Sequence, residues 1–409
     1  MKAINIIILL LVSLNVCATK VVHLKSDRNL QAQLSQENTT YVINFSHNLK
    51  NSILELPDRS YLLFGEEGCL YNGTINGNNS EINAGRRLIL RDITVRGSWN
   101  NSTVYSEWVN FKSGKQNNNT AFTNLMTLCK GDKLTHFYMQ EDTFYVSAIN
   151  RSAPIQIPSN VYWHNKSTIK MLPTDLEWYN IVLIEKANNI TIDGGSFIGD
   201  LFNHIGNKGE WGHGIKCAGA TNITLKRLTA SYCWGDGIDL IEAFDEHNQP
   251  TINCNNIIVD SVQCIYNRRQ GMSIEAASNV SVTNSIFAYT GTIKRTLPSC
   301  GLDIEPWIDN GKKVSNIILS RCIMHSNMGY DIQISGNFRK PNEKIYNGFC
   351  IKDCQLNTMY AVRINGLKIE KTKISSELSI NNVKGVNINT SYINKLSKGY
   401  NVKSLIVIP

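Results

Sequence analysis

The chain has 409 residues, of which 42% are hydrophobic, so it is long enough to bury a sizeable core. Its formal net charge of +8 bears on solubility and on partners, but not on the fold. The sequence has no basic run with interleaved aromatic residues, so we expect no nucleic-acid partner. An acidic polymer remains compatible with this charge.

The N-terminus has the layout of an export signal. Lys2 supplies a charge, residues 6–12 are apolar, and Val16-Cys17-Ala18 resembles a cleavage site. We predict a signal peptide at 1–18, cut after Ala18, and hence a secreted or periplasmic protein. Cys17 leaves a lipid-anchored surface protein as the less favoured alternative. The apolar run is too short to span a bilayer, and we expect no transmembrane segment.

Residues 19–115 are predicted to form a β-rich N-terminal region. Short runs of β-branched and aromatic residues alternate there with Asn, Asp and Gly, which is typical of strands separated by turns. No catalytic constellation stands out. We interpret the region as a lead-in that covers one end of a repeat domain at 116–409.

A short helix is predicted next. Apolar residues recur at helical spacing from Ala121 to Cys129, behind the N-cap candidates Asn119 and Thr120. Gly131 then predicts the end of the helix.

One pattern returns five times between residues 212 and 333. Each copy is a glycine followed by residues that alternate in polarity, which predicts strands with one buried face. Repetition every few tens of residues predicts a stack of coils. The copies are Gly214-Ile215-Lys216-Cys217, Gly237-Ile238-Asp239-Leu240, Gly271-Met272-Ser273-Ile274-Glu275, Gly301-Leu302-Asp303-Ile304-Glu305 and Gly329-Tyr330-Asp331-Ile332-Gln333.

A second column of strands begins with asparagine in each coil, and a third short strand follows it. Stacked asparagine amides can hydrogen-bond along the axis of such a solenoid, so we interpret them as structural. Three strands per coil predict an all-β fold, a right-handed parallel β-helix with three sheets. The asparagine strands are Asn189–Ile192, Asn222–Leu225, Asn256–Val259, Asn279–Val282 and Asn316–Leu319.

The order of the helix and of the segments around Thr143–Ser147 and Ile157–Val161 resembles the start of bacterial and phage β-helix proteins of the pectate-lyase-like superfamily. Asn267–Gly271 and Gly301–Pro306 resemble uncharacterised members of that group. The resemblance covers residues 117–370. It implies a parallel β-helix whose first coil is plugged by the helix, and it does not fix one activity.

Insertions between the repeats are expected to wall a groove over the glycine strands, because loops at the margins of a sheet commonly carry binding sites. Three insertions follow glycine strands and one precedes the next glycine strand. They fall at 244–253, 307–313, 336–346 and 289–299.

Carboxylates recur on the outward side of the glycine strands, and we predict that Asp239, Glu275, Asp303 and Glu305 are catalytic. Stacking places Glu275 beside Glu305, and Asp303 beside Asp331, in neighbouring coils. Close like charges raise one pKa, which supplies the acid and the ionised partner of glycoside hydrolysis. The favoured acid is Asp303 or Glu305, and its partner is Asp239 or Glu275.

Substrate-binding roles are predicted for cationic, acidic and aromatic residues along the same strip. Acids and arginines on exposed strands also keep sheets soluble, so each residue alone has a purely structural alternative. No metal ligand is predicted. The residues are His213, Lys216, Asp236, Arg268, Arg269, Trp307 and Asp331.

The favoured function is an exported glycoside hydrolase that cleaves a polysaccharide, acting without a cofactor and as a monomer. One alternative is a polysaccharide lyase, in which His213 and cations along the strip act on a uronic-acid polymer, with Ca²⁺ held by carboxylates. The other alternative is a non-catalytic carbohydrate-binding or adhesive solenoid.

Overall fold

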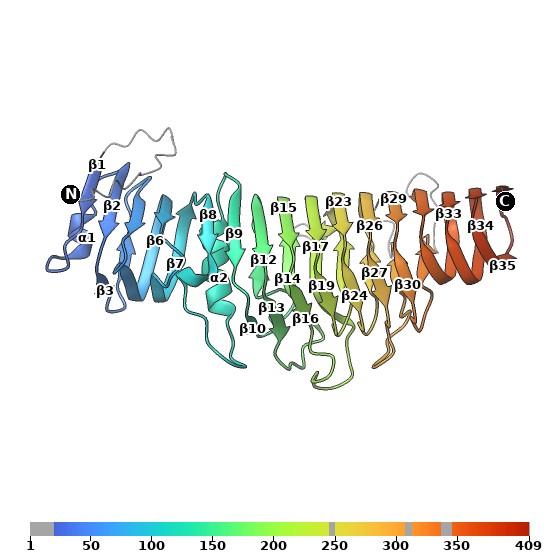
Figure 1. Cartoon of the computed structure of the whole chain (residues 1–409), viewed down its shortest axis with the longest axis horizontal. Helices are drawn as coiled ribbons and strands as arrows, with labels where there is room; N and C mark the ends of the chain where they lie inside the picture. Colours follow the sequence, from blue (N-terminus) through green and yellow to red (C-terminus); the bar gives the residue numbers. More distant parts are fainter. Residues whose placement is uncertain (1–19, 245–249, 307–312, 337–345, 409) are drawn as a thin grey trace, which may run out of the picture.

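The chain forms an elongated rod of stacked coils with the two termini at opposite ends (Figure 1). Within the described residues every strand pairing is parallel, apart from the antiparallel pair β21 (Ala243–Phe244) and β22 (Pro250–Ile252). The predicted signal peptide lies outside the described residues. The computed structural model describes residues 20–244, 250–306, 313–336 and 346–408.

The glycine repeats form one sheet, called here the glycine sheet. Ile215 pairs with Ile238, and Met272 pairs with both Ile238 and Leu302, so apolar residues of successive coils stack toward the interior. All four of these side chains are fully buried. The strands of the glycine sheet are β11 (Ile155–Gln156), β14 (Trp178–Glu185), β17 (Trp211–Ala218), β20 (Ile238–Ile241), β25 (Met272–Ile274), β28 (Leu302–Ile304) and β31 (Ile332–Ser335).

Two further sheets close each coil, so the predicted three-sheet parallel β-helix is confirmed. The asparagine sheet contains β9 (Thr135–Met139), β12 (Val161–Asn165), β15 (Asn188–Asp193), β18 (Thr221–Lys226), β23 (Cys254–Asp260), β26 (Ala277–Thr283), β29 (Val314–Ser320) and β32 (Tyr346–Lys352). The third sheet contains β10 (Thr143–Val146), β13 (Thr168–Met171), β16 (Ser196–Ile198), β19 (Thr229–Ser231), β24 (Gln263–Ile265), β27 (Ile286–Ala288) and β30 (Ile323–His325).

At the C-terminal end, single long strands take part in more than one sheet. β33 pairs with β30, β31 and β32 along its length, and β34 continues the stack. The coils here therefore turn without breaking the strand. These elements are β33 (Gln355–Glu370), β34 (Lys373–Asn389), β35 (Tyr392–Lys398) and β36 (Lys403–Ile408).

The N-terminal region is also built from parallel strands, which form a separate seven-stranded sheet. β8 (Thr103–Tyr105) already pairs with β9 of the longer stack, so strand pairing to the repeat domain begins before residue 116. The elements before it are β1 (Lys20–His23), α1 (Leu30–Gln33), β2 (Thr39–Ile43), β3 (Ser46–Asn48), β4 (Ile53–Glu55), β5 (Tyr61–Phe64), β6 (Cys69–Asn83) and β7 (Leu90–Trp99), and a 3₁₀ turn at Ser106–Trp108 follows it.

The predicted helix is confirmed as α2 (Asn119–Cys129), and its apolar stripe is buried. It packs against β7, β8 and β11, so it lies inside the rod between N-terminal coils and the glycine sheet (Figure 1). The Asn124 amide donates to the carbonyl of Ile93 at 2.6 Å and accepts from the N–H of Val95 at 2.9 Å. The helix thereby satisfies open backbone groups of β7, rather than capping the end of the chain.

The glycine column exists because the backbones of neighbouring coils approach closely there. A Cβ on Gly271 would lie 2.3 Å from the carbonyl oxygen of Gly301, and one on Gly237 would lie 2.6 Å from that of Gly271. Both separations are far below van der Waals contact, so any side chain at these positions displaces the next coil.

The asparagine column has a different cause, which is a left-handed backbone turn at the start of each strand. Asn222, Asn256 and Asn316 have φ of 54°, 56° and 55°, a region that asparagine tolerates better than most residues. Farther along, Gly348 and Gly366 adopt φ of 75° and 76° at the start of the equivalent segments. The backbone conformation, rather than the amide alone, therefore selects the residue.

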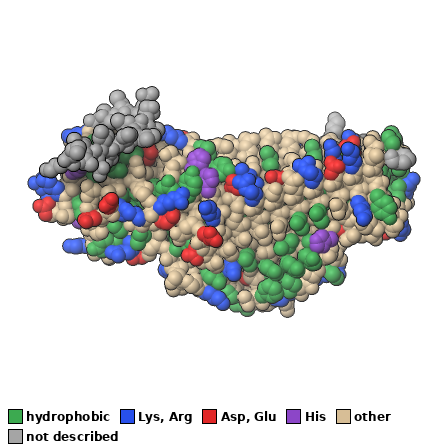
Figure 2. All heavy atoms as spheres, viewed as in Figure 1, with side chains coloured by type: hydrophobic (Ala, Val, Ile, Leu, Met, Phe, Trp, Pro, Cys, Tyr) green, Lys and Arg blue, Asp and Glu red, His purple; other side chains and the backbone are tan. Residues whose placement is uncertain are grey.

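Figure 2 shows the face of the rod that Figure 1 presents. Charged side chains are scattered along this face and do not gather into one basic stripe (Figure 2). None of the helices in the described ranges is both long enough and apolar enough to cross a membrane.

Candidate functional site

The fifth glycine repeat is shifted by two residues relative to the prediction. Gln333, not Asp331, pairs with Asp303, while Asp331 lies beside Gly301 in the glycine column. The predicted stacking of Asp303 on Asp331 is therefore wrong.

Asp331 instead holds a turn together. Its carboxylate accepts from the amide of Asn327 at 2.8 Å and from the backbone N–H of Asn357 at 2.6 Å, and its side chain is nearly inaccessible. These contacts bind two successive coils, so Asp331 is not available to a substrate in this structure.

The polar column of the glycine sheet lies below the surface. Asp236, Asp239 and Asp303 are each at most 1% exposed, although alternation places Asp239 and Asp303 on the outward side. Longer side chains close over them: the side chains of Lys216 and Arg269 are 24% and 13% exposed. The expected solvent-exposed column is thus corrected to a buried layer of short carboxylates beneath a layer of longer charged side chains.

Arg269 is the centre of this layer. Its guanidinium nitrogens lie 3.0 Å from Asp236 Oδ2, 2.5 Å from Glu305 Oε1 and 3.7 Å from Glu210 Oε2. Ser273 also donates to Asp236 Oδ2 at 2.7 Å. Burial opposes the charge of Arg269, but the surrounding carboxylates raise its pKa well above the usual value. Sequence reasoning missed Glu210, which precedes the glycine strand rather than lying on it.

Asp303 and Glu305 form a coupled pair. Asp303 accepts from Gln270 at 2.7 Å and from Gln333 at 3.1 Å. Burial raises the pKa of Asp303 well above its ordinary range, and the neighbouring Glu305 raises it further. The Glu305 side chain is 21% exposed, so it is the member of the pair that a ligand can reach.

A second cluster lies on the N-terminal side of this pair. Lys216 Nζ is 3.3 Å from Asp239 Oδ2, and His213 Nε2 is 3.8 Å from the same oxygen. The backbone N–H of Asp236 donates to His213 Nδ1 at 3.1 Å. Burial lowers the pKa of His213 to about 3, so this imidazole is neutral at physiological pH. His213 therefore orients Asp239 without being exposed to solvent.

Arg268 serves the scaffold. Its guanidinium donates to the carbonyl of Gly209 at 2.7 Å and to that of Asn207 at 3.2 Å, and it lies 3.8 Å from the ring centre of Trp234. These contacts pin the 199–210 segment beside the glycine sheet. Arg268 is only 7% exposed, and two of its guanidinium nitrogens already donate to backbone carbonyls, which does not favour its predicted substrate-binding role. Residues 199–210 are not among the insertions that were predicted to wall the groove over the glycine sheet.

The predicted insertions are only partly within the described residues. Residues 245–249, 307–312 and 337–345, and with them Trp307, lie outside the described residues. The insertion at 289–299 is described, and its Thr296 N–H donates to the carbonyl of Arg268 at 3.2 Å. That insertion therefore packs against the residue that holds the 199–210 segment.

The titration of Asp236 yields a first testable prediction. Burial raises its pKa to about 7, although Arg269 and Ser273 act in the opposite direction. Asp236 in the folded state therefore keeps a proton that the unfolded chain releases near the ordinary aspartate pKa of 3.8. As the pH rises from about 4 to about 7, the contribution of Asp236 to the free energy of unfolding becomes progressively less favourable. We expect the melting temperature of Asp236→Asn, relative to the parent chain, to increase between about pH 4.5 and pH 8.

At about 1.4 kcal/mol per pKa unit, the corresponding change in the free energy of unfolding is at most about 4 kcal/mol. Thermal melts of both proteins across this range check it. A melting-temperature difference that does not vary with pH would contradict the prediction.

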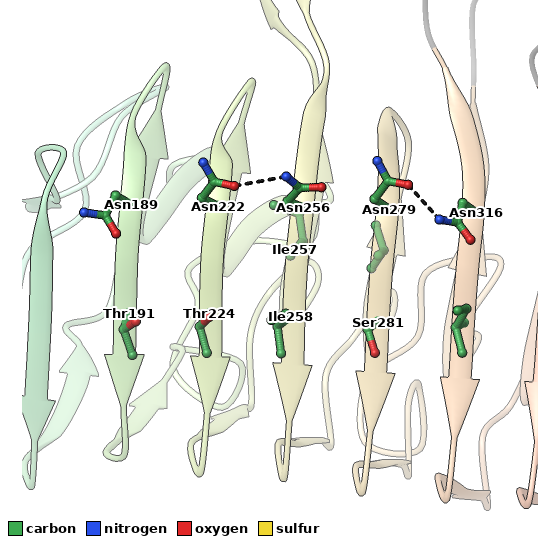
Figure 3. A pocket seen from close by; sticks show the side chains of 12 residues that line it. Asn189, Thr191, Asn222, Thr224, Asn256, Ile257, Ile258, Asn279, Ser281 and Asn316 are labelled. Atoms are coloured by element: carbon green, nitrogen blue, oxygen red, sulfur yellow. Dashed lines mark hydrogen bonds between the residues drawn. The ribbon is translucent and has the colours of Figure 1, made fainter.

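A different hollow lies over the asparagine sheet and has a volume of about 560 Å³. It is lined by amides, hydroxyls and aliphatic side chains, with no titratable residue. Figure 3 shows the amides of Asn222 and Asn256, and of Asn279 and Asn316, bridging neighbouring strands. Because acid–base chemistry needs titratable groups, the glycine sheet is the better candidate for an active site.

No group of three or more His, Cys, Asp and Glu residues suited to a metal ion occurs within the described ranges. The same residues contain ten unpaired cysteines, most of them buried.

Comparison with known sequences finds relatives of unknown activity. Uncharacterized protein YclG of Bacillus subtilis (strain 168) is 29% identical over 209 residues, which are 46% of this chain and 35% of YclG. SPbeta prophage-derived uncharacterized protein YorA of the same organism is 26% identical over 204 residues, 44% of this chain and 34% of YorA. The match thus spans about a third of each relative. No protein-family model matches the chain.

Comparison with solved structures finds other β-helices. The tailspike protein gp49 of Acinetobacter baumannii bacteriophage Fri1, a capsular polysaccharide depolymerase, is 11% identical with a TM-score of 0.48, over 75% of this chain and 62% of gp49. ORF18 of Geobacillus virus E2 is also 11% identical, with a TM-score of 0.46 over the same shares of the two chains. The strand pairing shows a three-sheet parallel β-helix, which is the fold that the sequence predicts.

Proposed function

We propose that this protein is a glycoside hydrolase that cleaves a polysaccharide bound along the glycine sheet. The observation that carries the proposal is the Asp303–Glu305 pair, in which the pKa of the buried Asp303 is raised and the solvent-accessible Glu305 contacts Arg269. A carboxyl that stays protonated at neutral pH, close to an ionised partner, is the requirement of this chemistry. The predicted signal peptide supports action outside the cytoplasm.

Glu275 is the proposed partner. It lies one coil before Glu305, and adjacent parallel strands place the two backbones about 4.8 Å apart. Glu275 helps to raise the pKa of both Lys216 and Arg269, so its charge lies close to two cations that favour its ionised form. A retaining mechanism needs carboxyl groups about 5–5.5 Å apart, and the one-coil spacing of the two backbones is compatible with that separation.

In that mechanism the Glu275 carboxylate attacks the anomeric carbon, while Glu305 delivers the proton of the pair to the departing sugar oxygen. Water then attacks the glycosyl–enzyme bond and returns a proton to Glu305, which releases Glu275. Asp303 and Asp239 act as positioning residues, because neither is exposed to the substrate.

The lyase alternative is less well supported. His213, its candidate base, is 3% exposed, and the donors of Arg268 are used by backbone carbonyls. Non-catalytic sugar binding is the second candidate, and it is favoured by the amide-lined hollow over the asparagine sheet.

Digestion of a panel of neutral and acidic polysaccharides by the purified protein tests these functions. A hydrolase releases new reducing ends without the ultraviolet absorbance of unsaturated uronates. Reducing ends that appear together with that absorbance would identify a lyase instead. Binding to a polysaccharide without any cleavage would favour the non-catalytic alternative.

A further inference from the structure

A small aromatic pocket lies on the glycine sheet directly beside the carboxylate cluster. Its volume is about 200 Å³, which is below the roughly 300–1,000 Å³ typical of sites for drug-sized ligands, so it suits a single small ring. Lys216 lines this pocket and also forms an ion pair with Asp239, so the pocket and the carboxylate cluster share one side chain.

Two indole rings form one wall of the pocket. Trp178 and Trp211 are paired across neighbouring coils, and their ring centres are 4.8 Å apart at an angle of 74°. Trp211 is 39% exposed, which is unusual for so large an apolar side chain in a well-packed stack. The Arg151 guanidinium lies 4.3 Å from the centre of the Trp178 ring and closes the other side. Apolar ring faces beside polar groups match the alternating faces and edges of a sugar ring.

Two buried polar atoms in the pocket lining have no hydrogen-bond partner. Asn180 is 5% exposed, and although its amide nitrogen donates to the carbonyl of Ser152 at 3.2 Å, its Oδ1 accepts nothing. The indole N–H of Trp178 is also buried and without an acceptor. Both atoms are closed off from solvent, so they lie behind the pocket surface, and polar contacts with a ligand come from the charged side chains that line it.

The charges around the pocket balance. Arg151 and Lys216 contribute two positive charges, and Glu185 and Glu242 contribute two negative charges. Lys216 is also already bonded to Asp239. A sugar that carries a carboxylate would meet Glu185 and Glu242 without a surplus cation to compensate, so a neutral ring is favoured.

We propose that this pocket binds one uncharged pyranose residue of the substrate, on the same sheet as the proposed catalytic pair and two to three coils from it. The proposal deepens the hydrolase function and rests on it for the polymer, but the binding of a single sugar to the pocket can be measured independently. It assigns Trp211, which is 39% exposed, as the stacking residue.

Saturation-transfer NMR of the full chain with glucose, galactose, mannose, glucuronate and galacturonate at millimolar concentration tests the proposal. We expect at least one neutral hexose to bind and both uronates to bind at least tenfold more weakly. Trp211→Ala should weaken the binding of that hexose at least tenfold, and Trp211→Phe should restore most of it. Tyr400→Ala, an exposed aromatic residue at the far end of the rod, should have no effect.

The outcomes separate this proposal from the catalytic one. If no neutral hexose binds, if uronates bind better, or if Trp211→Ala binds normally, the pocket assignment is overturned, whatever the activity. If Trp211→Ala abolishes hexose binding while Glu305→Gln leaves cleavage intact, the pocket stands and the catalytic assignment fails.

Discussion

Glu305→Gln is expected to lower kcat/KM for polysaccharide cleavage by about 10²–10⁴-fold, the usual contribution of a positioned acid–base group. Glu305 is the solvent-accessible member of the pair, and Gln preserves its size while removing the carboxyl group that would transfer a proton. The fold should survive, because the side chain is partly exposed and lies at the top of the polar layer. Initial rates of reducing-end release, together with a thermal melt, check both expectations.

Two further variants sharpen this test. Asp303→Asn should move the alkaline limb of the pH profile to lower pH, because it removes the carboxyl whose pKa burial and the neighbouring Glu305 raise well above its ordinary range. A purely structural role for Asp303 would lower the amount of folded enzyme without moving that limb. Glu141→Gln, in an exposed position before β10, serves as the matched control and should retain full activity. If both Glu305→Gln and Asp303→Asn cleave at the parent rate, this strip is not the active site.

Gly271→Ala is expected to be the most destabilising single-methyl change in the glycine column. The added Cβ would lie 2.3 Å from the backbone oxygen of Gly301 in the next coil. A backbone oxygen cannot move aside by a change of rotamer, as a side chain can. Overpacking typically costs about 1–3 kcal/mol, and an obstacle made of backbone places this change at the upper end of that range. A clear drop in melting temperature should result.

Gly85→Ala is the matched control. A Cβ at Gly85 has no atom within 4 Å, and its φ is not in the left-handed region. Restricting the unfolded chain should leave stability unchanged or raise it by up to about 1 kcal/mol. Equal melting temperatures for the two alanine variants would show that coil spacing adjusts freely, contrary to the close approach described above.

The sequence predicted the sheets well, because alternation and glycine spacing are properties of the chain itself. The predicted register of the fifth repeat was wrong because it was based on the position of Gly329 and not on the alternation of apolar residues. Ile332 and Ile334 continue the Leu302 and Ile304 columns, and that parity was the signal for the correct register. Asp331 takes the column position that glycine holds in the preceding coils.

The burial of the outward-facing carboxylates could not be predicted from the sequence, for a different reason. Alternation indicates on which side of a sheet a side chain lies, but not how far neighbouring side chains extend over it. Asp303 is buried because Gln270, Gln333 and Glu305 from three different coils converge on it. The contacts of Arg268 with the 199–210 segment join residues about 60 positions apart, which no local pattern reports.

α2 lies where the ladder of strand pairing along the rod is interrupted. Within the described residues, strand pairing between β7 and the later chain is limited to an isolated bridge between Leu90 and Val109, and α2 adds the two hydrogen bonds of Asn124 to β7. In a linear array, stability depends on the interface between each unit and the next. The helix is therefore a joint at which unfolding that begins at one end is expected to pause, leaving the coils that carry the carboxylate cluster intact after the N-terminal block has opened.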